Sequence, residues 1–453
     1  MIHTIKFKLT KYFSEGHERS LKAKKNIIST FFLKGANIVI GLIIVPLTIT
    51  YVNPTQYGIW LTLSSIITWF SFFDIGLGNG LKNRLIEALA NKDYILAKTY
   101  VSTTYFIIGL ISFLLLTVFL IGSFFINWAT VLNAPQSMQK ELTLVAITIF
   151  GIFSFQFILQ LINTVAIANQ SVIVSNLTGL LGNFLGLIIV FIFTRTTHGS
   201  LIYLCLSIGI SPLIVLVIFN LIMFNTNYKD YSPSFKCVKI SYAKSILQLG
   251  VKFFIIQIGL IFFYNLDNVL ISNIVGPSAV TSYNIAYKYF SVITMISNII
   301  MTPFWAAFAE ANLRGDISWI KGSVAKLSKI VVLIFILSFV MLLASKFVYH
   351  LWIGSKVMIP FSLSIILAFY TSFNTYRTIF VFYMNGVGKL NIQFLIVFIS
   401  GMLNVPFGII LGKAYGATGV ILSTTILCVF CGVVEIIQYR KLISNTAKGI
   451  WNK

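Results

Sequence analysis

Long apolar stretches are the feature of this sequence that most restricts its fold. Several of them reach the roughly 20 residues that an α-helix needs to cross the hydrocarbon core of a bilayer. In lipid the backbone polar groups must bond to one another, so a spanning chain forms either helices or a closed barrel. The alternating ten-residue segments of a membrane barrel are absent from the sequence. The sequence therefore predicts an all-α polytopic membrane protein.

Composition supports the same fold class. Of the 453 residues, 58% are hydrophobic and only 10% are charged. A soluble domain carries about 25% charged residues, so this chain could not cover a soluble surface. No cleavable signal peptide is expected, because residues 1–26 are polar and basic and the first apolar run is too long and lacks a small-residue cleavage site.

The apolar runs predict about twelve membrane helices, six in each half of the chain. The predicted spans are 27–51, 57–77, 101–126, 143–168, 171–194, 200–224, 247–274, 280–304, 330–352, 359–384, 391–412 and 417–438. The predicted domains are a cytoplasmic basic tail at 1–26, a six-helix bundle at 27–225, a cytoplasmic linker at 226–246, a second six-helix bundle at 247–438 and a cytoplasmic tail at 439–453.

The formal net charge of +22 has an uneven distribution along the chain. If the N-terminus is inside, 24 of the 33 Lys and Arg residues lie on the inner side, five on the outer side and four in or near the spans. This asymmetry follows the positive-inside rule and places both termini in the cytoplasm. The basic residues then face the cytoplasm and anionic lipid head groups, so no nucleic-acid partner is needed. The five outer bases are Lys140, Arg195, Lys346, Lys356 and Lys413.

A shift of 223 residues aligns the two halves of the chain. It places Pro54 on Pro277, Glu87 on Glu310, Ala88 on Ala311, Asp93 on Asp316 and Lys98 on Lys321. Because each half holds six predicted helices and begins inside, we interpret the match as a parallel repeat, with two bundles related by an axis along the membrane normal.

The stretch "FFDIGLGNG", residues 72–80, carries three glycines at every second position. The dinucleotide-binding fingerprint needs its third glycine one residue later and a buried strand before the first, so this stretch does not match it. We predict a structural elbow at the inner membrane surface, with Asp74 as a helix cap or a partner of the neighbouring basic loop. The residues assigned to this cytoplasmic elbow and its repeat are Asp74, Arg84, Glu87 and Glu310.

Residues 31–93, "FFLKGANIVIGLIIVPLTITYVNPTQYGIWLTLSSIITWFSFFDIGLGNGLKNRLIEALANKD", resemble the N-terminal signature of bacterial O-antigen and capsule flippases. These Wzx-type proteins belong to the multidrug/oligosaccharidyl-lipid/polysaccharide exporter superfamily. The resemblance implies two six-helix bundles in a V, a central cavity and alternating access in the bacterial inner membrane.

The resemblance also implies a cargo, namely undecaprenyl-diphosphate-linked oligosaccharide flipped between the leaflets. The other partners expected on this basis are membrane lipids, a polysaccharide polymerase and a chain-length regulator. Transport needs no covalent chemistry, so we expect a transporter without a cofactor. Coupling to a gradient of H⁺ or Na⁺ is left open.

Four ionisable residues lie well inside the predicted spans: Lys34, Asp267, Lys288 and Arg377. Each costs roughly 2.5–3.5 kcal/mol to insert before it is paired, so such residues mark functional sites by default. Asp267 and Lys288 lie about level on antiparallel helices and are expected to form either a structural ion pair or a gate or ion-coupling site. If they pair, Lys34 and Arg377 remain as two uncompensated positive charges in a cationic cavity, which suit a diphosphate.

Amide side chains provide the remaining candidates for substrate binding. Gln156, Gln160 and Asn163 fall at i, i+4 and i+7 on one stripe of a helix, and Asn37 lies one turn beyond Lys34. Such amides could bind sugar hydroxyls or could hold helices together.

Two alternative functions compete with the flippase. A cation-driven drug exporter of the same superfamily would need carboxylates in its cavity, whereas this sequence offers one deep carboxylate and three deep bases. A polysaccharide polymerase or ligase would need acid, base or Arg groups on a large outer loop. The longest outer loop, near 127–142, holds one Lys and one Glu. Cys428 and Cys431 form C-x-x-C within an apolar helix without partner ligands, so no metal site is predicted.

Overall fold

The computed structural model describes residues 18–74, 76–169, 171–243 and 266–452. Most of the predicted basic tail at 1–26 and most of the predicted span at 247–274 lie outside the described residues. The predicted linker at 226–246 contains three short 3₁₀ turns, η3 (Lys229–Tyr231), η4 (Phe235–Cys237) and η5 (Ile240–Tyr242).

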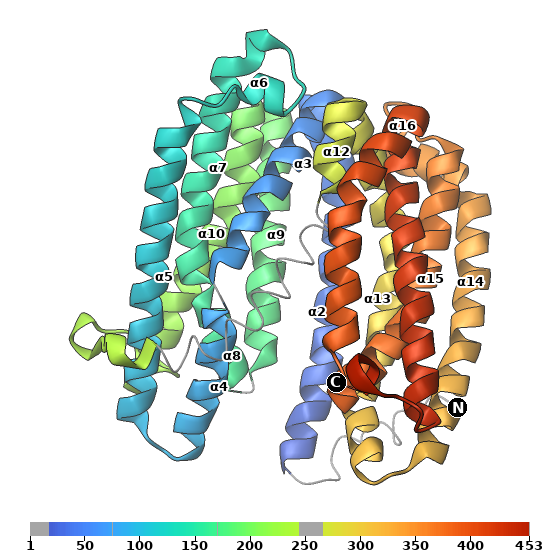
Figure 1. The fold of residues 1–453 in the computed structure, drawn as a ribbon. Coiled ribbons are helices and arrows are strands. Elements are labelled where there is room, and N and C mark those ends of the chain that lie inside the picture. The colour runs from blue at the N-terminus through green and yellow to red at the C-terminus, as the bar shows by residue number, and fades with distance from the viewer. Residues whose placement is uncertain (1–17, 75, 170, 244–265, 453) are drawn as a thin grey trace, which may run out of the picture. The chain divides into compact units, whose positions relative to one another are not determined.

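The described chain is built from helices joined by short loops (Figure 1). In chain order the main helices are α2 (Glu18–Val52), α3 (Pro54–Trp69), α4 (Leu77–Ala90), α5 (Tyr94–Ser123), α7 (Gln139–Leu159), α8 (Leu161–Ala168), α9 (Val172–Thr196), α10 (Leu201–Asn225), α12 (Asp267–Ile274), α13 (Pro277–Leu313), α14 (Ile317–Ile353), α15 (Phe361–Val387) and α16 (Asn391–Ile443). The shorter elements are η1 (Phe70–Asp74), α6 (Trp128–Val131), η2 (Gln136–Met138) and η6 (Gly449–Asn452).

Eight stretches of helix in the described part of the chain are long and apolar enough to cross a membrane. One of them, α16, covers the two predicted spans at 391–412 and 417–438. Between these spans the backbone leaves helical geometry at Gly416 (φ 61°, ψ −145°). The predicted spans at 57–77 and 359–384 correspond to α3 with η1 and to α15. The fold class, an all-α multi-pass membrane protein with about twelve membrane helices, is thereby confirmed.

The chain divides into two compact units, each of which draws on separate stretches of sequence. The first comprises Met1–Tyr51, Ser71–Phe125 and Thr143–Phe254, and the second comprises Val52–Phe70, Ile126–Leu142 and Ile255–Lys453. These units differ from the bundles predicted from the sequence in that α3 and residues 126–142 group with the second unit. The predicted boundaries of the bundles stay a prediction.

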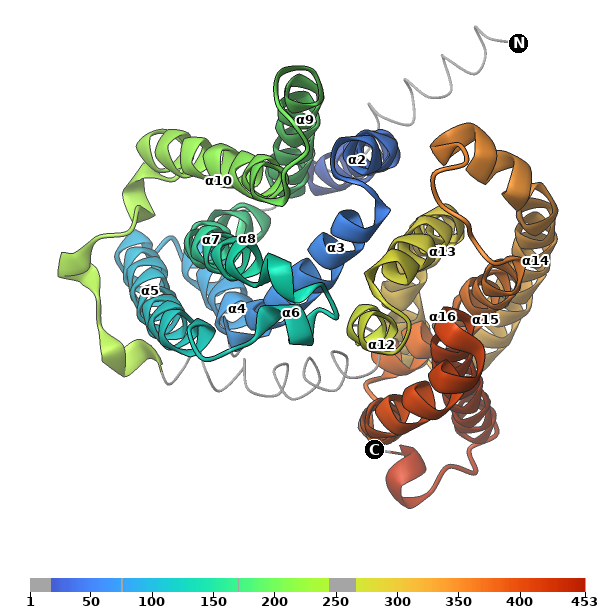
Figure 2. The ribbon, with the colours of Figure 1, turned by 90° about the horizontal axis from the view of Figure 1, so that it is seen from above.

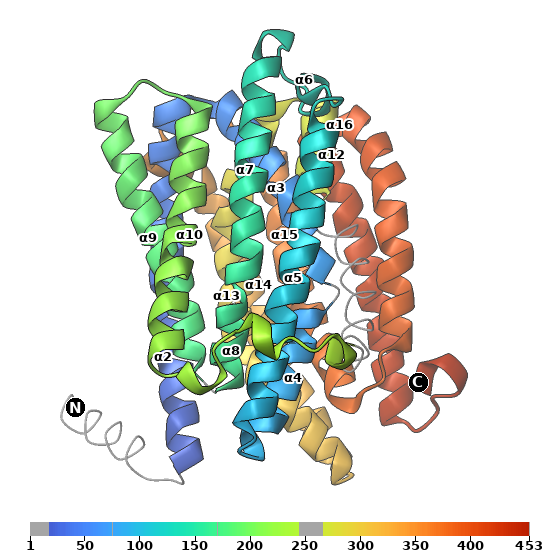
Figure 3. The same cartoon turned by 90° about the vertical axis from the view of Figure 1, so that its left-hand side faces the viewer.

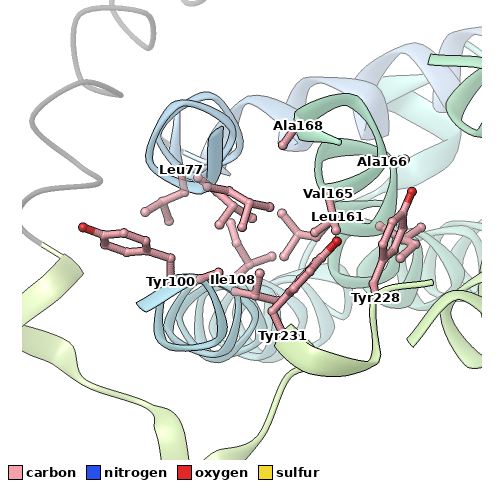
Figure 4. Close-up of a cluster of buried hydrophobic side chains, with 14 of the residues drawn as sticks. Leu77, Tyr100, Ile108, Leu161, Val165, Ala166, Ala168, Tyr228 and Tyr231 are labelled. Atoms are coloured by element: carbon pink, nitrogen blue, oxygen red, sulfur yellow. The ribbon is translucent and has the colours of Figure 1, made fainter. Parts of the chain in front are cut away.

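In the first unit, α5, α7, α9 and α10 run lengthwise together (Figure 3). One end of the unit is held by a cluster of buried apolar residues from α4, α5 and α8, onto which two tyrosines of the linker, Tyr228 and Tyr231, fold (Figure 4). Leu77 and Leu161 are buried within this cluster. Burying such a side chain contributes roughly 1.5–3 kcal/mol, so the linker is anchored to the bundle by packing.

In the second unit, α13, α14, α15 and α16 gather into one group (Figure 2). Phe308 of α13 and Tyr383 of α15 are buried there, with their ring centroids 5.7 Å apart in an edge-to-face arrangement. Offset and edge-to-face aromatic pairs contribute about 0.5–1.5 kcal/mol beyond the area they bury. This aromatic pair packs α13 against α15, the helix that carries Arg377.

The 223-residue repeat is reproduced in the local backbone. Pro54 and Pro277 each occupy the first turn of their helices, α3 and α13. Asp93 accepts a hydrogen bond from the backbone N–H three residues later at 2.9 Å, and Asp316 accepts the equivalent bond at 2.9 Å. An Asp at the N-cap satisfies a helix N–H that otherwise has no partner. The equivalent residues thus perform equivalent structural tasks.

The two halves differ at the predicted elbow. In the first half, α3 ends at Trp69 and α4 begins at Leu77 after Gly76, whose φ of 75° is left-handed. Glycine adopts this conformation without steric cost. In the second half, α13 runs unbroken from Pro277 to Leu313 through the equivalent residues.

Candidate functional site

Lys34 lies on the polar side of α2. Phe32, Val39 and Ile43 are exposed on one side of this helix, as expected of a surface that faces lipid. At 3.6 residues per turn, Lys34 lies about half a turn away from that apolar stripe. It shares its own side with Thr30 and Asn37, at i−4 and i+3.

Hydrogen bonds link this side of α2 to α9 at positions before and after Lys34. Asn176 donates to the Thr30 hydroxyl at 3.0 Å, and Asn183 donates to the Asn37 side-chain carbonyl at 2.8 Å. Lys34 therefore lies between two interhelical contacts made by amide side chains.

Lys34 is a base without a carboxylate partner in the described part of the chain. The ion pairs among the described residues are Arg84–Glu87, Arg314–Glu310 and Arg377–Glu435. Lys34 belongs to none of these pairs, and its side chain is exposed. Its positive charge therefore remains available to an anionic ligand.

A cavity of ≈ 340 Å³ opens within the first unit and brings two of the predicted amides together. Gln160 and Asn163 line it, along with Asp74 and Lys82. Asn163 also accepts a hydrogen bond from the Thr178 hydroxyl of α9 at 2.9 Å. Because α9 also carries the amides that contact α2, one helix connects the polar side of α2 to this cavity.

Gln156 does not share this environment. It donates to the Gly209 carbonyl oxygen of α10 at 2.6 Å and so holds two helices together. Gln160 lies between α7 and α8, so Gln156 and Asn163 belong to two successive helices. Gln156 thus makes an interhelical contact, which is one of the two roles left open for these amides.

The elbow residues have local structural roles. Asp74 accepts hydrogen bonds from the N–H groups of Gly76 at 2.8 Å and Gly78 at 3.3 Å, and so caps the start of α4. Arg84 pairs with Glu87 at 2.9 Å within the same helix, and Glu310 of the repeat pairs with a neighbouring arginine of its own helix end. Solvent-accessible pairs of this kind contribute only about 0.3–0.5 kcal/mol, so they are minor contributors to stability.

Arg377 is neutralised inside the second unit. Its Nε lies 2.7 Å from one carboxylate oxygen of Glu435, and its Nη2 donates to the other at 2.9 Å. Both side chains are buried, at 4% and 0% exposure. The interpretation of Arg377 as an uncompensated cation is therefore wrong.

Glu435 is a buried carboxylate that the sequence analysis did not identify as a candidate site residue. It falls three residues before the predicted end of the last span at 438, where a charged side chain is expected to reach the membrane surface. In the structure α16 continues to Ile443, so Glu435 lies farther inside its helix than predicted. A carboxylate within an apolar run was the signal available in the sequence.

Asp267 is held by neutral groups rather than by Lys288. Tyr283 donates to one carboxylate oxygen at 3.3 Å, and Thr424 donates to the other at 3.1 Å. The side chain of Asn404 is also hydrogen-bonded to this carboxylate. No ion pair between Asp267 and Lys288 occurs among the described residues, so the expectation of a structural pair is wrong.

The surroundings of Asp267 are closed to solvent. Asp267 is 6% exposed and Asn404 is fully buried. Ser423 and Thr424 both direct their hydroxyl groups at the Asn404 carbonyl oxygen, at 2.9 and 3.2 Å. Since a hydroxyl has one proton to donate, Thr424 cannot satisfy Asp267 and Asn404 at once. The site therefore gathers oxygen atoms around one buried carboxyl group.

The cysteines do not form a metal site in the described part of the chain. Cys428 and Cys431 are buried in α16 as free thiols. No group of three or more His, Cys, Asp or Glu side chains suited to a metal occurs among the described residues.

Long apolar helices that keep ionisable and amide side chains on polar faces are typical of multi-pass membrane transporters. Residues 23–306 match the family described as polysaccharide biosynthesis protein. This match covers more than half of the chain, and the chain belongs to that family. The resemblance to Wzx-type exporters is thereby confirmed.

A relative agrees with this assignment, and solved structures share the fold. A "Putative O-antigen export protein" from Yersinia pseudotuberculosis is 24% identical over 385 residues, which cover 81% of this chain and 83% of that protein. An inward-facing multidrug resistance MATE family transporter aligns with a TM-score of 0.73 at 14% identity, over 93% of this chain and 98% of that one. The lipid II flippase MurJ, in an inward closed conformation, aligns with a TM-score of 0.72 at 14% identity, over 91% and 87%.

Proposed function

We propose that this protein flips undecaprenyl-diphosphate-linked oligosaccharide across the bacterial cytoplasmic membrane by alternating access. The family assignment and the O-antigen export relative support a polysaccharide cargo. The observation that carries the proposal is Lys34, a base on the polar side of a membrane helix and between amide contacts.

Lys34 and the cavity of the first unit bind different parts of the head group. A sugar diphosphate carries about two negative charges, which would cost tens of kcal/mol to bury in hydrocarbon. Lys34 offsets part of that cost by contacting the diphosphate. Gln160 and Asn163 bind sugar hydroxyls at the cavity, since amides both donate and accept hydrogen bonds. The lipid tail stays in the bilayer.

The second unit supplies the coupling to an ion gradient. Asp267 is a buried carboxyl group whose hydrogen-bond partners are neutral hydroxyl and amide groups. An ionised carboxylate in such a place is costly unless a positive charge joins it, so the site suits H⁺ or Na⁺. Ion binding and release at Asp267 then favour different states of the transport cycle.

The charge distribution supports an orientation with both termini in the cytoplasm. The cargo then enters from the inner leaflet and leaves on the outer side, where a polymerase and a chain-length regulator would receive it.

A drug exporter of the same superfamily is the second candidate, because a MATE transporter shares the fold. The sequence argument against a drug exporter counted one deep carboxylate and three deep bases. Glu435 adds a second carboxylate and so weakens that argument. The buried Arg377–Glu435 pair is nonetheless neutral, so Arg377 is not available to an anionic cargo, whereas Lys34 and the cavity residue Lys82 of the first unit belong to none of the ion pairs among the described residues.

The two functions are separated by measuring both cargoes in one deletion strain. We expect the strain to accumulate lipid-linked oligosaccharide on the inner leaflet and to recover when the wild-type gene returns. Its sensitivity to cationic drugs should stay unchanged. Drug sensitivity without oligosaccharide accumulation would reject the proposed function.

A further inference from the structure

A second cavity, of ≈ 460 Å³, lies within the second unit and has no role in the function proposed above. We call it the outer pocket. It is lined mainly by three segments, at 275–282, 356–363 and 415–418. These segments are the three loops of the second half that the charge distribution assigns to the outside, together with the helix starts that follow them.

The chemistry of the lining is cationic and rich in hydroxyl groups. Lys356 lies in the wall, and none of the described residues that line the pocket is acidic. Tyr415 is 65% exposed at the rim. The hydroxyl groups of the lining also include Ser278, Ser282, Ser362 and Thr418.

Hydrogen bonds within the lining join its separate segments. The Ser282 hydroxyl donates to the Met358 carbonyl oxygen at 2.9 Å, and the hydroxyl groups of Ser362 and Thr418 lie 3.1 Å apart. Each contact connects two of the three loops that form the pocket. These hydrogen bonds therefore hold the walls of the pocket together.

A second base lies close to the same pocket. The Lys346 Nζ is 5.2 Å from the ring centre of Phe361, which immediately precedes the lining residue Ser362. Bases are rare on the predicted outer side of this chain, with five among 33, so two of them at or near one cavity are a departure from the positive-inside pattern.

We propose that the outer pocket binds the phosphate of a lipid head group in the outer leaflet. Lys356 contacts the phosphate, and Ser278 and Tyr415 donate hydrogen bonds to its oxygens. The phosphate belongs either to the transported cargo after it has crossed or to an anionic phospholipid. Binding of the cargo phosphate depends on the proposed function. Binding of either phosphate depends on the predicted orientation of the chain in the membrane.

Binding of defined lipids to the purified full-length protein tests this inference. Native mass spectrometry would compare undecaprenyl diphosphate, phosphatidylglycerol and zwitterionic phosphatidylethanolamine as probes. We expect Lys356→Gln to weaken binding of a phosphate probe by about tenfold or more, as the loss of a charged hydrogen bond predicts. Lys140→Gln removes the same charge from another predicted outer residue, which does not line the pocket, and is the matched control.

The outcomes separate the two sources. Weaker binding of undecaprenyl diphosphate alone identifies a release site for cargo, and weaker binding of phosphatidylglycerol, alone or as well, identifies a phospholipid or general phosphate site. Unchanged binding of both probes, or an equal loss in Lys140→Gln, would overturn the inference. Failure of the proposed function is distinguishable, because it appears as unimpaired transport in Lys34→Gln while the Lys356 effect on binding persists.

Discussion

Each unit contains a base deep in a predicted span, Lys34 in the first and Arg377 in the second, and these two bases have opposite surroundings. Lys34 of the first unit is exposed on a polar helix face between amide contacts. Arg377 of the second unit is buried and held by both oxygens of Glu435. A charge that is already paired cannot also neutralise a ligand without losing its partner. The comparison therefore favours anion binding in the first unit and a structural task for Arg377.

The largest effect is expected from breaking the pair in the second unit. Glu435→Ala leaves Arg377 buried without its carboxylate, which costs about 3–5 kcal/mol. We expect a large fall in the melting temperature of the purified protein and in its level in the membrane. Replacing both residues with Met should recover most of that stability, because an apolar pair of similar volume avoids the unpaired charge. An unaltered melting temperature in Glu435→Ala would show that the pair is not structural.

The next effect concerns transport rather than stability. Lys34→Gln should reduce the rate of oligosaccharide flipping by about 10- to 100-fold, as expected for the loss of a charged contact. Its melting temperature should stay close to that of the wild type, since Lys34 is exposed. Lys34→Arg keeps the charge and should retain most of the activity.

Lys326→Gln, on the exposed surface of α14, is the matched control and should transport normally. If Lys34→Gln flips its cargo at the wild-type rate, the assignment of anion binding to the first unit fails.

A third change tests whether the second unit handles the coupling ion. Asp267→Asn should abolish the response of transport to an imposed H⁺ or Na⁺ gradient, while binding of undecaprenyl diphosphate changes by less than about twofold. Asp230→Asn alters an exposed carboxylate and should leave the gradient response intact. Gradient-driven transport by Asp267→Asn would place the coupling elsewhere.

Features that follow from local rules could be predicted from the sequence. Pro54 and Pro277 begin α3 and α13, and Asp93 and Asp316 cap α5 and α14, because these tasks depend on a few neighbouring residues. The apolar runs predicted the helices for the same reason. The position of Lys34 inside a membrane helix also follows from the apolar run around it.

The partners of the buried charges could not be predicted in this way. Glu435 is 58 residues from Arg377 and on another helix, so its pairing depends on how α15 packs against α16. Asp267 was expected to lie near Lys288, yet Thr424, which is 157 residues away, contacts it instead. Helical spacing places residues along one helix, whereas these contacts depend on the rotation and depth of a second helix.

The smallest effect is expected from the amide contacts that flank Lys34. Asn37→Ala and Asn183→Ala each remove one hydrogen bond between α2 and α9, and such bonds average about 0.6 kcal/mol in a membrane protein. The double variant should lose little more than either single variant, because both remove the same contact. Transport should fall by no more than about threefold. Asn225→Ala removes a bond within its own helix and serves as the control. Strictly additive losses would mean that Asn37 and Asn183 act separately, and the position of Lys34 would then depend on α2 and on the Thr30–Asn176 contact.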